Sequence, residues 1–118
     1  MSQTWLTAVM PIHNGQRFLP ATLESAARQR PDGVEFLLLD SSDDLDASRQ
    51  ILGSFEDRLD IRWVNSRDQP SWTQKTNRGV ELAGAPHVCM LHQDDLWLDG
   101  HLIAVRAGIM ANPNAGLS

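Results

Sequence analysis

Cysteine is nearly absent from this chain, and long apolar runs are absent altogether. The one cysteine, Cys89, lies within a short apolar segment. It therefore allows no internal disulfide and no cysteine metal cluster, and we expect an inert thiol in the core. No segment approaches the roughly 18 apolar residues that a membrane span needs. Residues 1–10 lack the basic lead and long apolar stretch of a signal peptide. These absences favour a cytoplasmic setting without a membrane span.

Basic residues are also scarce. The chain has 10 Lys and Arg against 15 Asp and Glu, which gives a net charge of −5. This balance argues against nucleic acid or an anionic membrane as the main partner. With 118 residues, of which 42% are hydrophobic, residues 1–118 are long enough to form a single domain with a real core.

What is present is an alternation of short apolar runs with helical patterns. The runs predict four buried strands, and the helical patterns follow them with Gly, Pro or Asn at their ends. Pro11 is expected to stop the first strand. The predicted strands cover 6–10, 34–39, 60–65 and 87–91, and the predicted helices cover a stretch beginning near Pro20 and residues 47–55, 73–83 and 100–111.

This order predicts an α/β fold with a mostly parallel sheet and helices on both faces. The carboxyl ends of parallel strands meet at one edge of the sheet, where such folds bind their ligands. We therefore expect four loops to converge there, at residues 11–15, 40–44, 65–71 and 93–95.

Two adjacent carboxylates, Asp94 and Asp95, directly follow the last apolar run. Two negative charges at a strand end need a cation or hydrogen-bond donors, and a divalent ion shared with substrate phosphates is one solution. A helix N-cap is the other, because Asp is favoured there. The pair alone does not decide between the two.

Four segments, taken together and in order, resemble the family 2 glycosyltransferases. They are residues 9–15 (VMPIHNG, followed by Phe18 and Leu19), 35–44 (EFLLLDSSDD), 77–83 (NRGVELA) and 91–97 (LHQDDLW). The resemblance covers nearly the whole chain with the right spacing. It implies a Rossmann-like GT-A fold, of which this chain is the N-terminal nucleotide-sugar-binding part.

In this resemblance, Asp40 accepts a hydrogen bond from the ring N–H of uracil or thymine. The alternative for Asp40 is an aspartate that bonds its own turn. Pro11, His13 and Asn14 would form the walls for base and ribose, with His13 where the family usually has tyrosine. Asn77 and Asp94 complete the implied nucleotide-binding set.

The acidic pair would hold Mn²⁺ or Mg²⁺ against the diphosphate, with Asp95 as direct ligand and Asp94 shared between ribose and metal. His92 stands where the family has an aspartate, and it either ligates the ion or only packs at the strand end. Lys75 either reaches a phosphate as a point charge or is an ordinary solvated surface lysine. Trp72 is a further candidate for contact with the donor, although Trp5, Trp63 and Trp97 are expected to pack.

The implied activity is transfer of a sugar from a UDP- or dTDP-sugar to an acceptor hydroxyl, metal-dependent and inverting. The acceptor would be a saccharide or a lipid-linked group, as in polysaccharide biosynthesis. No residue can be nominated as the catalytic base, which is expected beyond Ser118, so the isolated chain should be inactive. An alternative is a non-catalytic nucleotide-binding or interaction fragment.

A receiver or phosphatase-like protein is a weaker alternative, because the first strand does not end in a nucleophilic aspartate. The expected location is cytoplasmic, with peripheral attachment at the inner face of the membrane as a variant. A sheet that ends at its fourth strand would expose an edge, which favours a homo-oligomer.

Overall fold

The computed structural model describes residues 4–29, 31–68, 71–91 and 100–111, without the side chains of 102–103 and 109–111. Within these ranges, strands and helices alternate as the sequence predicts. The elements are β1 (Leu6–Ile12), α1 (Leu19–Ala27), β2 (Val34–Asp40), α2 (Leu45–Gly53), β3 (Asp60–Asn65), α3 (Trp72–Leu82), β4 (His87–Met90) and α4 (His101–Ala111).

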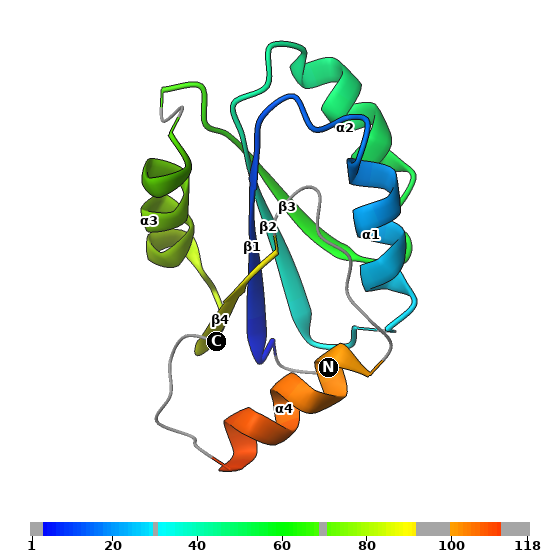
Figure 1. Cartoon of the computed structure of the whole chain (residues 1–118), viewed down its shortest axis with the longest axis vertical. Coiled ribbons are helices and arrows are strands. Elements are labelled where there is room, and N and C mark those ends of the chain that lie inside the picture. Colours follow the sequence, from blue (N-terminus) through cyan, green and yellow to red (C-terminus); the bar gives the residue numbers. More distant parts are fainter. Residues whose placement is uncertain (1–3, 30, 69–70, 92–99, 112–118) are drawn as a thin grey trace.

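The four strands form one parallel sheet in the order β3-β2-β1-β4. Helix α3 covers one face, and α1 and α2 cover the other (Figure 1). Helix α4 lies near the amino ends of the strands, where Arg106 sits 5.2 Å from the ring centroid of Trp5. The predicted α/β class and the convergence of the first three strand ends on one edge are confirmed.

Each face of the sheet carries its own apolar cluster. The larger one joins alternate residues of β1 and β2 to α1 and α2, and includes Met10, Phe36 and Leu38. The smaller one, centred on Val9 and Leu39, faces α3. Strands that are apolar on both sides are typical of parallel sheets covered by helices, which explains why β1 and β2 read as continuous apolar runs.

Cys89 belongs to the larger cluster and is only 5% exposed. Burial raises the pKa of its thiol to about 12, because the charged thiolate is poorly solvated there. The expectation that Cys89 lies in the core is confirmed.

Pro11 does not stop the first strand, contrary to the prediction. Strand β1 continues to Ile12, and Pro11 pairs with Leu39 of β2. The carbonyl of Val9 accepts from Leu91 N at 2.9 Å, on the β4 side of the strand. Groups two residues apart on a strand point the same way, so the N–H that Pro11 lacks would also face β4. Proline therefore ends the β1–β4 ladder while the β1–β2 ladder continues.

Two helices begin earlier than predicted, because polar side chains cap them. Asp44 accepts from Ala47 N at 3.0 Å and starts α2 at Leu45. Ser71 forms a reciprocal capping box with Gln74 and starts α3 at Trp72. No helix within the described ranges is long and apolar enough to cross a membrane.

Helix α3 lies close against the sheet at Gly79. A Cβ at this position would overlap Val9 Cγ1 and would lie 3.1 Å from Leu39 Cδ1. Both neighbours are fully buried, so neither can move aside without disturbing the core. The glycine of the segment 77–83 is therefore required by packing.

Overpacking a core usually costs about 1–3 kcal/mol, and alanine is better than glycine within a helix by about 1 kcal/mol. We therefore expect Gly79→Ala to destabilise the fold by a net amount of up to about 2 kcal/mol. Thermal or urea unfolding measures the change. Gly53→Ala is the matched control, since a Cβ at Gly53 meets nothing within 4 Å. Equal loss in both variants would contradict this account.

Candidate functional site

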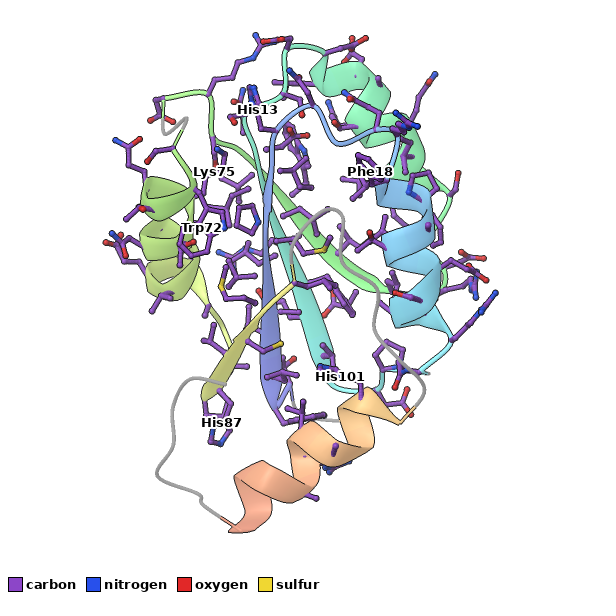
Figure 2. All side chains as sticks on the ribbon, viewed as in Figure 1. His13, Phe18, Trp72, Lys75, His87 and His101 are labelled. Atoms are coloured by element: carbon purple, nitrogen blue, oxygen red, sulfur yellow. The ribbon has the colours of Figure 1, made fainter. Side chains whose placement is uncertain are left out.

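The candidate site lies at the carboxyl edge of the sheet, where β1, β2 and β3 end. The register pairs Ile12 with Asp40 and Asp40 with Asn65, so the three strands finish at one level. The structure thereby brings four predicted residues to the same edge: Pro11, His13, Asn14 and Asp40. Lys75, which belongs to α3, lies at the same end of the sheet as His13 (Figure 2).

Asp40 ends β2 with a fully buried carboxylate. Its Oδ1 accepts a hydrogen bond from Ser42 N at 2.9 Å, and its Oδ2 accepts from Trp63 Nε1 at 3.1 Å. The bond to Ser42 is the local turn that the alternative reading of Asp40 described, but the bond to Trp63 comes from another strand. Asp40 is therefore more than a turn residue, because it joins β2 to β3.

Asn14 connects the loop after β1 to the loop after β2. Its amide Nδ2 donates to Asp43 Oδ2 at 3.1 Å, and its Oδ1 accepts from Asp43 N at 2.9 Å. Its own backbone N–H donates to Ser42 Oγ at 2.9 Å. The residue has φ of 51°, a left-handed conformation that asparagine tolerates better than most residues. This reciprocal pairing fixes the two loops against each other.

His13 stands on the exposed side of this edge. Its Nδ1 lies 3.1 Å from the carbonyl oxygen of Ser41 and 3.1 Å from Ser41 Oγ. A carbonyl oxygen can only accept, so Nδ1 donates to it and carries a proton. The other ring nitrogen, Nε2, lies 3.4 Å from the amide nitrogen of Asn14 and is oriented to accept from it. These contacts hold the His13 ring at the exposed side of the site.

Lys75 is not the solvated surface lysine that one alternative described. It lies on α3 facing the sheet and is 2% exposed. Burial lowers the pKa of its ammonium group, and the negative charge of Asp40 acts in the opposite direction. A lysine buried this deeply is unusual. It lies on the α3 face of the sheet, whereas Asp40 bonds Trp63 on the opposite face.

Trp63 and Arg67 belong to the site although the sequence reading assigned them no role in it. The ring of Trp63 lies 5.3 Å from the guanidinium carbon of Arg49, beside a hollow of about 700 Å³ between α2 and β3. Arg67 donates from Nε to the carbonyl of Ser42 at 3.3 Å and from its guanidinium to the carbonyl of Asp43. The alternation of side chains along the strands could have identified Trp63 as a neighbour of Asp40. Leu38 pairs with Trp63, and Asp40 lies two residues after Leu38, so its side chain is on the same face of the sheet.

Two other predicted residues lie away from this cluster. Asn77 is on the exposed side of α3, and Trp72 is 52% exposed at the start of that helix. The predicted metal ligands His92, Asp94 and Asp95 fall outside the described residues, as does Trp97. Within the described ranges, no group of three or more His, Cys, Asp or Glu side chains could hold a metal ion. The chain enters segment 92–99 from Leu91, whose N–H donates to the carbonyl of Val9, three residues before the end of β1.

The arrangement is suited to binding a polar ligand at the sheet edge. It provides a buried acceptor-only carboxylate, a buried cation nearby and exposed polar loops with fixed backbones. Ser66 adds a fully buried hydroxyl whose oxygen has no hydrogen-bond partner within the described ranges, and its N–H donates to the carbonyl of Asp40 at 2.8 Å. These groups can recognise hydrogen-bond donors and acceptors on a ligand.

Comparison with solved structures identifies the fold. The Staphylococcus aureus protein TarS, residues 1–349, aligns with a TM-score of 0.79 at 19% identity, over 92% of this chain and 33% of that chain. The same protein in complex with UDP aligns with a TM-score of 0.77 at 20% identity, over 92% of this chain and 33% of that chain. In complex with UDP-GlcNAc it aligns with a TM-score of 0.78 at 19% identity, over 92% of this chain and 32% of that chain. The fold is therefore that of GT-A glycosyltransferases.

Comparison by sequence identifies the family. Two validoxylamine A glucosyltransferases, from Streptomyces hygroscopicus subsp. limoneus and subsp. jinggangensis, are 34% identical over 88 residues, which is 73% of this chain. The chain spans only 19% and 21% of their lengths. The family model for glycosyl transferase family 2 matches residues 7–117. This chain belongs to glycosyl transferase family 2.

Proposed function

We propose that the carboxyl edge of the sheet binds the nucleotide of a UDP- or dTDP-sugar, the donor of a glycosyl transfer. The observation that carries the proposal is the buried carboxylate of Asp40 at the end of β2, in a chain of this family. Solved complexes of the structurally similar TarS with UDP and UDP-GlcNAc support a nucleotide-sugar donor.

Asp40 would select the base. Among the described residues, each of its oxygens accepts one hydrogen bond, and an ionised carboxylate has about four acceptor positions. It therefore keeps capacity for the ring N–H of uracil or thymine. Because the carboxylate is fully buried in this structure, the base reaches it only when neighbouring groups of the edge move aside. The exposed ring of His13 lies where the base would enter the site.

The acidic segment would hold the metal. Asp95, Asp94 and His92 supply two carboxylates and an imidazole, a donor set that suits Mn²⁺ and also Mg²⁺ through the carboxylates. A bound divalent ion would stabilise the charge of the departing diphosphate as a Lewis acid. Asp94 would also bond the ribose, and Asp95 would be the direct ligand.

The complete reaction would be inverting. The acceptor hydroxyl would bond to the anomeric carbon as the bond to the diphosphate breaks, and a general base would take its proton. The acceptor would be a saccharide or a lipid-linked group of polysaccharide biosynthesis, in the cytoplasm. The chain spans about a fifth of its glucosyltransferase relatives. A second candidate function is nucleotide binding without turnover.

The first test concerns the metal. UDP should bind measurably with Mn²⁺ or Mg²⁺ and much more weakly with a chelator, because the ion offsets repulsion between the diphosphate and the acidic pair. Asp95→Ala should remove this metal dependence. Isothermal calorimetry measures both. Asp60→Ala is a matched control, since Asp60 is exposed at the amino end of β3. Equal affinity with metal and with chelator would refute the assignment.

The second test concerns the base. Uridine nucleotides should outcompete cytidine nucleotides, whose ring N3 has no hydrogen. A hydrogen bond to a charged group contributes about 1.5–3 kcal/mol, or roughly 10- to 100-fold in affinity. Asp40→Asn should erase most of this preference, because an amide can both donate and accept. Competition binding on both variants measures it. Unsubstituted protein that binds both nucleotides equally would exclude this role for Asp40.

A further inference from the structure

The indole of Trp63 joins β3 to the carboxylate that we propose selects the base. Trp63 pairs with Leu38, and Asp40 lies two residues after Leu38 on the same face of the sheet. The indole Nε1 donates to Asp40 Oδ2 at 3.1 Å. The guanidinium carbon of Arg49, on α2, lies 5.3 Å from the centroid of the ring. The ring is therefore held at two points, by its N–H at Asp40 and by the cation of α2.

Two hydrogen bonds determine the orientation of the Asp40 carboxylate. Rotation about the last side-chain bond of aspartate has broad energy minima, so one hydrogen bond to one oxygen leaves the plane of the carboxylate variable. Here Oδ1 accepts from Ser42 N at 2.9 Å, and Oδ2 accepts from Trp63 Nε1. The bond to Ser42 is local to the turn, whereas the bond to Trp63 comes from the neighbouring strand. One donor on each oxygen therefore fixes the plane of the group.

We propose that Trp63 is a positioning residue for base recognition: its indole N–H holds the Asp40 carboxylate in the orientation that accepts the ring N–H of uracil or thymine. This inference rests on the proposed function of Asp40 and adds a second residue that determines specificity. A donor to an sp² oxygen lies near the plane of the acceptor group. A fixed carboxylate plane therefore restricts the directions from which a base can donate, and Trp63 acts through Asp40.

The orientation matters because uracil and cytosine present their donors at different positions. Uracil carries a hydrogen on ring N3, whereas cytosine has none there and carries its donor on the adjacent exocyclic amino group. A carboxylate held in one orientation favours the donor with which it is aligned. A carboxylate that is free to turn can accept from the amino group of cytosine as well. Loss of the indole N–H should therefore lower the preference for uridine nucleotides although the carboxylate itself remains.

The chain offers a matched control for this indole. Trp5 lies just before β1, at the opposite end of the sheet, and its Nε1 donates to the carbonyl of Asp32 at 2.9 Å. Its ring also contacts a guanidinium group, that of Arg106, at 5.2 Å. Trp5→Phe and Trp63→Phe each keep an aromatic ring and remove one indole N–H that donates a hydrogen bond. The two variants differ in whether that bond ends on Asp40.

The experiment measures competition between UDP and CDP for the full chain in the presence of Mn²⁺. Trp63→Phe should lower the UDP-over-CDP ratio of affinities by about 2- to 10-fold, the range expected when one side chain must be ordered on binding. Trp5→Phe should leave the ratio unchanged. An equal loss of preference in the two variants would overturn the proposal, because it would show general damage to the fold.

A thermodynamic cycle with Asp40→Asn tests whether Trp63 acts through the carboxylate. An asparagine at this position donates as well as accepts, so most of the base preference is already lost in that background. Trp63→Phe should therefore lower the ratio in the aspartate background and leave it unchanged in the asparagine background. An equal change in both backgrounds would contradict an action through Asp40.

Nuclear magnetic resonance of the indole groups keeps the test decisive if Trp63→Phe folds poorly. The chain has four tryptophans, so the Nε1–H signal of Trp63 can be assigned by elimination from Trp5→Phe, Trp72→Phe and Trp97→Phe. Saturation with UDP should shift this signal more than saturation with CDP, because the carboxylate that accepts from the indole would also bond the base. A signal that UDP leaves in place would exclude the role of Trp63.

The outcomes separate this inference from the proposed function on which it rests. Equal binding of UDP and CDP by the unsubstituted chain would refute the proposed role of Asp40. A preference for UDP that Trp63→Phe retains in full would refute the role of Trp63 alone.

Discussion

The parallel pairing of β1 with β2 is the constraint on which the rest of this structure depends. Seven consecutive pairs run from Leu6 with Val34 to Ile12 with Asp40, and every residue of both strands is buried. Because side chains alternate between faces, a slip of one residue would exchange the two apolar clusters. The same register brings the loops after the two strands to one level, so that Asn14 meets Asp43.

The fold could be predicted from the sequence because its determinants are local. Continuous apolar runs indicate buried parallel strands, and Gly, Pro and capping residues mark where helices begin and end. The predicted end of the first strand was wrong because Pro11 affects the two neighbouring strands differently. Pro11 lacks a hydrogen-bond donor toward β4 but pairs normally with β2. A sequence pattern does not show which neighbouring strand a missing donor would face. The capping residues Asp44 and Ser71 were visible in the sequence, and they account for the shifted starts of α2 and α3.

The candidate site was only partly predictable, because its long-range contacts depend on packing. Motif resemblance identified Asp40, His13 and Asn14, and the structure places them at one edge. Lys75 was ambiguous, since a lysine on a helix is usually exposed, and only the close approach of α3 at Gly79 shows that it is buried. The metal-binding role of Asp94 and Asp95 stays a prediction, because these residues lie outside the described part of the chain.

The burial of Cys89 makes the single thiol a natural chemical reporter of local unfolding. Among the described residues, strand β4 is joined to β1 by four residue pairs, whereas β2 is joined to β1 by seven. A thiol with a pKa raised to about 12 reacts with alkylating reagents chiefly after it reaches water. The modification rate of Cys89 would therefore follow the opening of this outer strand, which can occur at lower free energy than unfolding of the whole sheet. Modification of the Cys89 sulfur thus reports how often β4, the strand that precedes the acidic segment, opens.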